Sequence, residues 1–431
     1  MCIGLLAFSI LSTFFYFLQI FHPGTSDVLE YKELGFSAVE NGILNTDLSW
    51  RPFLYPQMLA VIFRIAKFLI MPENLILFIF QTSIYAISSI CLVSSIGKQN
   101  VLAAKIMFVM LSFNIFVIPY LGISLTDGIS FSLVILFLAT WTKIESHIAA
   151  KNIVLQKHIF FLTIISASAV EIRPQNFFLI VFTLYFLIHL KFRTKIALVP
   201  TLTTFLFGLF PFLVQLTINA TNFRKISVTP PNGLLALNMD TGIRLVKHAT
   251  GMPCYKCDPK IIAYPSNQLF QLPKSDGVNL LGLEWYTSNF WSALKLVGLK
   301  FVGIFDYENL VPYIYRVNQL ANLPSFVSFS IVILGLIGIV LHAKRRQTPQ
   351  LGSRVAPIFF AISWCLTTLF AAGENRYGFP LMLYFGFITS FLIAGTFVNQ
   401  KKYDVSRMVA AFCVLMVLFV FTASFVRSLR V

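Results

Sequence analysis

Long apolar segments recur along this chain of 431 residues, and short polar loops separate them. Because a helix needs about 20 mainly apolar residues to cross a bilayer, each segment of this kind predicts a spanning helix. Eleven segments fit the pattern: 3–21, 74–96, 102–120, 123–142, 159–171, 176–190, 196–217, 325–342, 355–372, 378–398 and 408–426. The pattern therefore predicts an all-α polytopic membrane protein with about 11 transmembrane helices.

Two of these segments, 159–171 and 176–190, are short and flank the sequence Glu171-Ile172-Arg173-Pro174. They are either two spans or one long broken helix. Basic residues occupy alternate loops, as the positive-inside rule requires for eleven spans, and these loops contain Lys98; Lys143, Lys151 and Lys157; Lys191, Arg193 and Lys195; Lys344, Arg345, Arg346 and Arg354; and Lys401, Lys402 and Arg407. With eleven spans the N-terminus is cytoplasmic and the C-terminus is external.

Two external stretches lack the spanning pattern. Residues 22–51 form a polar first loop, and residues 52–70 place Gln57, Arg64 and Lys67 near one helical face, which indicates a helix lying in the membrane interface. The alternative is that 52–70 also spans.

The long stretch 218–324 predicts one large external loop, and its Trp- and Phe-rich section from Trp285 to Phe305 has the composition of a segment that dips into the outer leaflet. Three regions follow from this pattern: an N-terminal transmembrane module (1–217) with a first external loop (22–70), an extracytoplasmic loop or cap (218–324), and C-terminal transmembrane helices (325–431).

Composition agrees with this organisation. Hydrophobic residues make up 57% of the chain and charged residues 12%, which excludes a soluble enzyme, a disordered scaffold and a coiled coil. The net charge of +16 lies in short clusters between apolar segments, and this is the pattern of cytoplasmic loops that face anionic lipid. Nucleic acid is therefore not an expected partner.

The carboxylates are distributed differently. Of the 17 Asp and Glu residues, only Glu145 and Asp404 lie on the cytoplasmic side in the eleven-span topology. Either the inner side simply excludes acids, or the outer side carries a functional acidic surface. Because Asp and Glu contribute little to topology, the second interpretation is favoured.

Cys254 and Cys257 form a C-Y-K-C pair in a polar stretch of the large loop. An oxidising compartment would close a disulfide between them. A zinc site is the weaker alternative, because there is no second C-x-x-C pair and only His248 lies nearby.

Candidate chemistry begins just after the first span. A carboxylate at Asp27, partly desolvated by the membrane surface, can serve as a general base. Asp27, Glu30 and Tyr31 would share one face of a helix whose N-cap is Thr25 or Ser26. The alternative is that Asp27 itself caps that helix.

Four elements together resemble the GT-C glycosyltransferases that use polyprenyl-phosphate sugars. The first loop resembles theirs through Asp27, Tyr31, Gly42 and Arg51-Pro52-x-x-Tyr55-Pro56. The other three elements are Thr126-Asp127 at the outer start of a span, Arg173-Pro174, and Gly373-Glu374-Asn375-Arg376-Tyr377-x-x-Pro380. Residues 218–324 have no counterpart in this resemblance.

The resemblance implies transfer of a sugar from a polyprenyl-phosphate donor to a hydroxyl of a glycan, lipid or protein on the extracytoplasmic face, with inversion. It implies that Asp27 is the base and Asp127 a second catalytic acidic position, although Asp127 could instead cap its helix. Arg51, Arg173 and Arg376 are candidates for the donor phosphate, and Glu30, Tyr31, Tyr55, Glu374 and Tyr377 are further substrate-binding candidates. For Arg376 the alternatives are an ion pair with Glu374 or a lipid headgroup contact, and Arg51 and Arg173 have the same kind of structural alternative.

No cofactor is expected with certainty. A divalent metal would need Asp27 and Asp127 to converge, and no D-x-D or H-x-x-H pattern supports one. The rival functions are a lipid or glycan transporter and a polysaccharide polymerase or ligase. A transporter would place charges near the membrane midplane, and a polymerase would concentrate arginine in the large loop, which holds only Arg224, Arg244 and Arg316.

Overall fold

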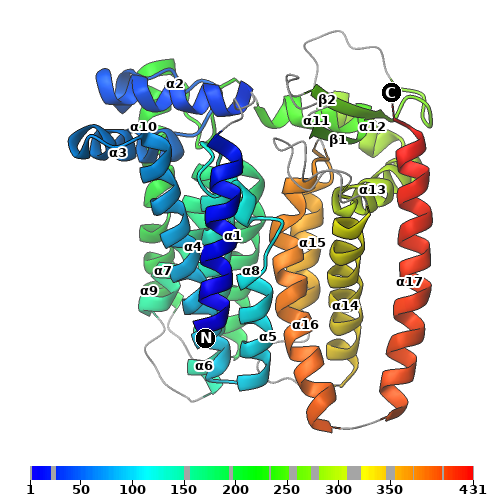
Figure 1. Ribbon diagram of the computed structural model, residues 1–431. Helices are drawn as coiled ribbons and strands as arrows, with labels where there is room; N and C mark the ends of the chain where they lie inside the picture. The colour runs from blue at the N-terminus through cyan, green and yellow to red at the C-terminus, as the bar shows by residue number, and fades with distance from the viewer. Residues whose placement is uncertain are drawn as a thin grey trace. The chain divides into compact units, whose positions relative to one another are not determined.

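The computed structural model describes residues 2–20, 26–149, 156–193, 198–232, 234–251, 260–272, 281–307, 322–345, 355–371, 373–399 and 402–430. Helices form almost all of this part of the chain, as expected for the all-α class, together with a two-stranded antiparallel sheet (Figure 1). Cys254 and Cys257 lie outside the described residues, so their disulfide stays a prediction.

The α-helices are α1 (Cys2–Ile20), α2 (Ser26–Glu40), α3 (Leu54–Leu69), α4 (Glu73–Gly97), α5 (Val101–Ser112), α6 (Asp127–Ala149), α7 (Gln156–Ile172), α8 (Phe177–Arg193), α9 (Leu198–Gly208), α10 (Phe210–Phe223), α11 (Leu234–Arg244), α12 (Leu281–Ser288), α13 (Phe290–Phe305), α14 (Leu323–Arg345), α15 (Ala356–Thr368), α16 (Phe379–Asn399) and α17 (Lys402–Ser428). The short 3₁₀ helices are η1 (Ile43–Asn45), η2 (Ile118–Tyr120), η3 (Pro174–Asn176) and η6 (Asn375–Gly378), and the strands are β1 (Leu245–Gly251) and β2 (Lys260–Pro265).

Helix occupies at least part of all eleven predicted apolar segments. Among the described residues, six helices are long and apolar enough to cross a membrane, and a seventh span results if α9 and α10, which meet at a 50° bend, are counted together. The six lie within Glu73–Gly97, Asp127–Ile148, Pro174–Phe192, Leu323–His342, Asn375–Gly395 and Ser406–Ser428. A multi-pass membrane protein is therefore supported, whereas the count of about eleven is not confirmed.

The segments 159–171 and 176–190 form two separate helices, α7 and α8. Ser166 Oγ on α7 lies 3.0 Å from Thr183 Oγ1 on α8, so the two helices pack side by side. The break has a local cause: Pro174 opens η3, and the preceding Arg173 is extended at φ −149° and ψ 107°. A residue before proline is driven out of the helical region by the proline ring.

The predicted span 102–120 is helical only as far as Ser112. Beyond it the chain is irregular apart from η2, and every residue from Phe116 to Thr126 is buried. Asn114 Oδ1 accepts hydrogen bonds from the backbone N–H of Phe116 and Val117, which competes with helix formation. Irregular backbone at membrane depth is tolerated only where protein covers it, and an apolar buried loop has the hydropathy of a span.

Two compact units make up the chain, and each is described by itself. The first contains Met1–Asn232 and Arg346–Ser363, and the second contains Gly233–Arg345 and Trp364–Val431.

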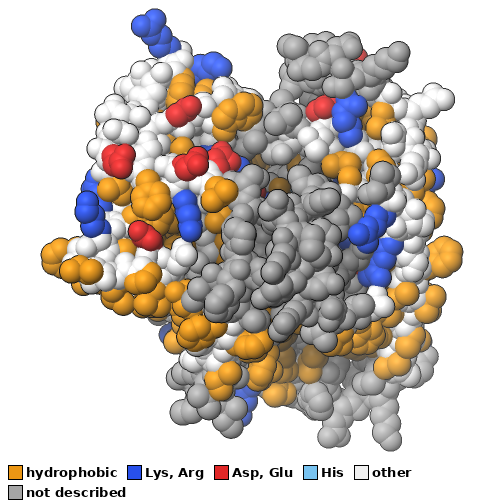
Figure 2. Space-filling view, turned by 45° about the horizontal axis from the view of Figure 1, so that its top comes forward, with side chains coloured by type: hydrophobic (Ala, Val, Ile, Leu, Met, Phe, Trp, Pro, Cys, Tyr) orange, Lys and Arg blue, Asp and Glu red, His pale blue; other side chains and the backbone are white. Residues whose placement is uncertain are grey.

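In the first unit α2 and α3 pack against each other and lie across the upper ends of α4 and α7 (Figure 1). The helix expected at 52–70 is present as α3, and it is not among the helices long enough to span. Acidic and basic side chains gather on the face of this unit that Figure 2 shows, with hydrophobic ones along its edge. Exposed Phe68 and Ile70, next to exposed Arg64 and Lys67, give the end of α3 the character of an interfacial helix.

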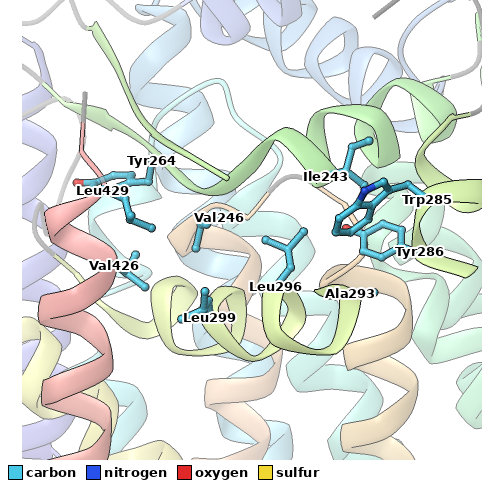
Figure 3. Packing of buried hydrophobic residues seen from close by; sticks show 10 residues of the cluster. All are labelled: Ile243, Val246, Tyr264, Trp285, Tyr286, Ala293, Leu296, Leu299, Val426 and Leu429. Carbon is cyan, nitrogen blue, oxygen red and sulfur yellow. The ribbon is translucent and has the colours of Figure 1, made fainter. Parts of the chain in front are cut away.

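In the second unit α14 packs beside α16 and α17. The segments α11, β1, β2, α12 and α13 share a hydrophobic core with the last turns of α17, as Figure 3 shows. Its members are Ile243, Val246, Tyr264, Trp285, Tyr286, Ala293, Leu296, Leu299, Val426 and Leu429. This core fixes β1 and the end of α13, which position one group of the candidate site residues.

Candidate functional site

The first turns of α2 present three side chains to one partner, Arg51. Asp27, Glu30 and Tyr31 follow the spacing i, i+3, i+4 and therefore share a face. The contacts of all three with Arg51 confirm the shared face. Asp27 also lies in the first turn, where a carboxylate interacts favourably with the positive end of the helix dipole.

Arg51 binds both carboxylates through one edge of its guanidinium group. Nε donates to Glu30 Oε1 at 2.9 Å, and Nη2 donates to Glu30 Oε2 at 2.6 Å and to Asp27 Oδ1 at 2.8 Å. Burial opposes this charge, but the hydrogen bond with Glu30 and the nearby Tyr31 and Asp27 raise the pKa of Arg51 above its ordinary value. Two carboxylates share this one guanidinium group, and among the residues described no partner contacts its Nη1.

Tyr31 and Tyr55 connect this cluster to the interior of the first unit. Their rings meet edge to face, with centres 5.0 Å apart, and the Arg51 guanidinium lies 4.9 Å from the Tyr31 ring centre. Burial raises the pKa of both phenols, so both remain protonated at neutral pH. Tyr31, backed by Tyr55, thus packs against the guanidinium of Arg51 and restricts its position.

Gln81 on α4 joins Tyr55 to the irregular segment that leads into α6. Its Nε2 donates to Tyr55 Oη at 3.3 Å and to the Ile123 carbonyl at 3.2 Å, and its Oε1 accepts from the Gly122 N–H at 2.9 Å. Gly122 has φ +93°, a left-handed conformation that favours glycine. We did not predict Gln81 from the sequence, although a buried amide within an apolar span is a signal of function or structural specificity.

Asp127 and Arg173 form a buried ion pair between the first residue of α6 and the extended residue before η3. Their side chains are 0% and 11% exposed, so neither charge would be tolerated there without the other. Arg173 Nε also donates to Gln175 Oε1 at 2.8 Å. The charge of Arg173 acts on Tyr31, and that of Asp127 acts on Tyr55, so this pair is a close neighbour of the α2 cluster.

The motif that runs from Gly373 to Tyr377, called the late motif from here on, forms a second group, in the second unit. Arg376 Nε donates to Glu374 Oε2 at 2.7 Å, and His248 Nε2 lies 3.4 Å from the same oxygen. Burial raises the pKa of Glu374, but Arg376 and His248 lower it more, so its net shift is downward. Tyr377 lies beside both Arg376 and His248, with the Arg376 guanidinium 5.9 Å from its ring centre. The ion pair anticipated as an alternative role for Arg376 is therefore present.

Asn375, between these two charged residues, fastens the motif to the end of α13. Its Nδ2 donates to the carbonyls of Ile304 at 2.7 Å and Asp306 at 2.9 Å. Carbonyls at a helix C-terminus lack partners within the helix, so this amide satisfies groups that would otherwise be orphaned.

Asp306 is itself a junction of four elements. Arg427 near the end of α17 donates to both carboxylate oxygens, at 2.9 and 2.5 Å, and Ser325 of α14 donates to Oδ1 at 2.9 Å. Lys247 of β1 donates to the Asp306 carbonyl at 2.7 Å. Burial raises the pKa of Asp306, but these cations and hydrogen bonds lower it more. Since His248 follows Lys247, the same junction positions the histidine beside Glu374.

Lys300 lies buried behind the late motif. Its Nζ donates to Tyr286 Oη at 3.1 Å and to the carbonyls of Leu369 at 3.0 Å and Ala371 at 2.8 Å. Burial lowers the pKa of Lys300 to about 7. Neither Lys300 nor the junction at Asp306 was expected from the sequence, because their partners lie far away along the chain.

Among the described residues, no group of three or more His, Cys, Asp or Glu side chains is arranged to hold a metal ion. Asp27 and Asp127 each have an arginine partner.

No model of a known protein family matches the sequence, and no curated protein matches it. A solved structure does: the crystal structure of the oligosaccharyltransferase of Archaeoglobus fulgidus in its apo form, with a TM-score of 0.52 and 11% sequence identity. The match covers 99% of this chain and 56% of that one. The chain has the GT-C fold. This result confirms the fold that the sequence motifs implied, while the chain spans just over half the length of the protein it matches.

Within the GT-C fold, the predicted site residues fall into two sets. Asp27, Glu30, Tyr31, Arg51, Tyr55, Asp127 and Arg173 are neighbours in the first unit, and Glu374, Arg376 and Tyr377 are neighbours in the second.

Proposed function

We propose that the chain is a membrane glycosyltransferase that transfers a sugar from a polyprenyl-phosphate donor to a hydroxyl of a glycan, lipid or protein. One observation carries the proposal: a partly exposed carboxylate, Asp27, shares a guanidinium with Glu30 beside the buried pair of Asp127 and Arg173. The GT-C fold supports the reaction class, because the solved structure with this fold is an oligosaccharyltransferase.

In the proposed reaction Asp27 is the general base. Its carboxylate accepts the proton of the acceptor hydroxyl while the hydroxyl oxygen forms a bond to the anomeric carbon of the donor. The bond from that carbon to the donor phosphate breaks, and its electron pair leaves with the polyprenyl phosphate. Attack opposite the phosphate inverts the anomeric centre. The side chain of Asp27 is 32% exposed, which leaves it accessible to an acceptor.

The departing phosphate needs cations, and the two units offer separate candidates for this role: Arg51 and Arg173 in the first unit and Arg376 in the second. Guanidinium groups match phosphate oxygens with two parallel N–H donors. Arg51 engages the carboxylates through Nε and Nη2 and offers Nη1. Arg173 and Arg376 are each held by a carboxylate, Asp127 and Glu374, which fixes the guanidinium before substrate arrives.

The remaining candidates support these groups in the proposal. Glu30 orients Arg51, and Tyr31 and Tyr55 form the wall behind it. Tyr377 lies against Arg376. The reaction as proposed needs no metal cofactor, and it takes place on the extracytoplasmic side of a topology with eleven spans and a cytoplasmic N-terminus.

The transferred group is either a single sugar or an oligosaccharide. The motifs of the sequence favour one sugar from a polyprenyl-phosphate carrier. An oligosaccharide is the second candidate, because the protein with the matching structure is an oligosaccharyltransferase.

The experiment that tests the proposal separates transfer from transport. Purified protein in vesicles is supplied with a polyprenyl-phosphate sugar labelled in the sugar and with a mixture of glycan and lipid acceptors. We expect the label to move to an acceptor, with release of polyprenyl phosphate in equal amount. Movement of the intact donor across the bilayer without cleavage of its sugar–phosphate bond would instead establish a transporter.

A further inference from the structure

Helix α13 has two apolar faces, and the second of them is packed against protein over only half of its length. Ala293, Leu296 and Leu299 point toward β1 and α12 in the hydrophobic core of the second unit (Figure 3). At 100° per residue, the opposite face carries a second apolar row. This row consists of Phe290, Trp291, Leu294, Phe301 and Phe305.

The C-terminal half of the second face rests on two other helices. The ring of Phe301 lies 6.2 Å from that of Phe419 on α17, and the ring of Phe305 lies 6.1 Å from that of Trp364 on α15. Among the described residues, no ring from another helix packs on the N-terminal half. Phe290 is 62% exposed, Trp291 78% and Leu294 54%. One continuous apolar row is therefore half packed and half bare.

The level of α13 relative to the spans of its own unit is fixed by hydrogen bonds. Asp306 directly follows α13 and binds Ser325, two residues after the start of α14, and Arg427, one residue before the end of α17. Both helices contain candidate membrane spans. The end of α13 therefore lies level with the ends of two spans, and the helix runs across them (Figure 1).

A helix at this level meets the boundary between acyl chains and headgroups. Tryptophan is enriched at that boundary because its ring is apolar and its N–H is polar. Lys295, next to the bare row, is exposed and adds a charge that attracts anionic headgroups. Three large apolar side chains exposed together on one edge are not expected to face water.

We propose that Phe290, Trp291 and Leu294 form a lipid-docking edge that is seated in the outer leaflet of the bilayer. Its occupant is the lipid itself, at the depth where acyl chains join the headgroups. Asn375 fastens Glu374 and Arg376 to the other end of α13, so docking holds the late motif at the height of a lipid-linked phosphate. This last consequence and the choice of the outer leaflet rest on the proposed function and its topology, whereas docking of the edge into the bilayer does not.

The test uses tryptophan fluorescence of the full chain in vesicles. Lipids brominated on the acyl chain near the headgroup quench tryptophans at that depth, and acrylamide quenches those that face water. The comparison is between the unmodified chain, Trp291→Phe and the matched control Trp285→Phe, because Trp285 is buried in the core. Substituting Trp291 leaves the core intact, since its side chain is mostly exposed.

We expect Trp291→Phe to lower the quenching of tryptophan fluorescence by brominated lipid and to leave the quenching by acrylamide nearly unchanged. We expect Trp285→Phe to change neither, because Trp285 is buried. Quenching of Trp291 by acrylamide alone would overturn the proposal, because the edge would then face water. Protection of Trp291 from both quenchers would also overturn it, because a second copy or another protein would then cover the edge. Neither readout requires catalysis, so failure here is separate from failure of the proposed transferase.

Discussion

Arg51 Nη2 lies 2.8 Å from Asp27 Oδ1, so the proposed base and a proposed phosphate ligand are already in contact before any substrate is present. Glu30 binds the same guanidinium through both of its oxygens. A donor phosphate that approaches Nη1 would therefore arrive next to the carboxylate that accepts the proton. Loss of Arg51 should therefore disturb both proton acceptance by Asp27 and binding of the donor phosphate.

The first prediction concerns Arg51→Gln. Without the shared guanidinium, two neighbouring carboxylates repel each other and the phosphate loses a donor. We expect turnover to fall at least about tenfold and the free energy of unfolding to fall by about 1 kcal/mol, a modest cost because the pair is partly exposed. Arg64→Gln is the control, since Arg64 is exposed and, among the described residues, its guanidinium donates only to the Val39 carbonyl. Turnover equal to that of the unmodified chain would remove Arg51 from the site.

The second prediction concerns Gln81→Leu. Leucine fills a similar volume but leaves the Gly122 N–H and the Ile123 carbonyl buried without partners. We expect the free energy of unfolding to fall by about 2–3 kcal/mol, and turnover to fall because Asp127 follows this segment. Ser88→Ala on the same helix is the control, because within the described part of the chain the Ser88 hydroxyl donates only to the Ile84 carbonyl. Equal thermal midpoints for the two variants would show that the hydrogen bonds of Gln81 to Gly122 and Ile123 do not stabilise the fold.

The third prediction is a pH dependence caused by Lys300. Burial lowers its pKa from 10.5 to about 7, so between these values the unfolded state binds more protons than the folded state. The contribution of Lys300 to the free energy of unfolding therefore rises with pH across this window, by at most about 1.4 kcal/mol per pH unit, and is constant below it.

Thermal midpoints of the unmodified chain, Lys300→Met and Lys295→Met, measured from pH 6 to pH 10 in detergent, check this dependence. We expect the slope to flatten only in Lys300→Met, because Lys295 is exposed. Parallel curves for all three proteins would show that Lys300 titrates normally.

The fourth prediction concerns Arg376→Ala. If Arg376 binds the donor phosphate, this variant should bind the polyprenyl-phosphate sugar and the bare carrier about tenfold or more weakly, since both present the phosphate. Arg376→Lys should recover only part of this affinity, because a point charge replaces a fork. Glu374→Gln tests the structural alternative. Unchanged carrier binding, together with a lowered thermal midpoint in both Arg376→Ala and Glu374→Gln, would limit the pair to holding η6 in place.

The positions of most helices follow from hydropathy, because a helix that lies within the bilayer needs mainly apolar side chains. The shared face of Asp27, Glu30 and Tyr31 also follows from local spacing, and the structure confirms it. Hydropathy fails after Ser112, where an apolar segment is buried as an irregular loop instead of a span.

Long-range partners account for what else was missed. Gln81 meets Gly122 and Tyr55, and Asn375 meets the end of α13, only after folding brings distant segments together. No spacing rule connects such positions. By contrast, the proximity of Arg376 and Glu374 was open to prediction because they are two residues apart.

The most direct test of the proposed function is Asp27→Asn, because this change removes the proton acceptor and keeps the shape of the side chain. Turnover of a polyprenyl-phosphate sugar and binding of the bare carrier are measured on the same reconstituted protein. We expect turnover to fall by roughly 10²–10⁴-fold, while carrier affinity and the thermal midpoint stay close to those of the unmodified chain. Turnover within a few-fold of the unmodified chain would contradict the role of Asp27 as the base.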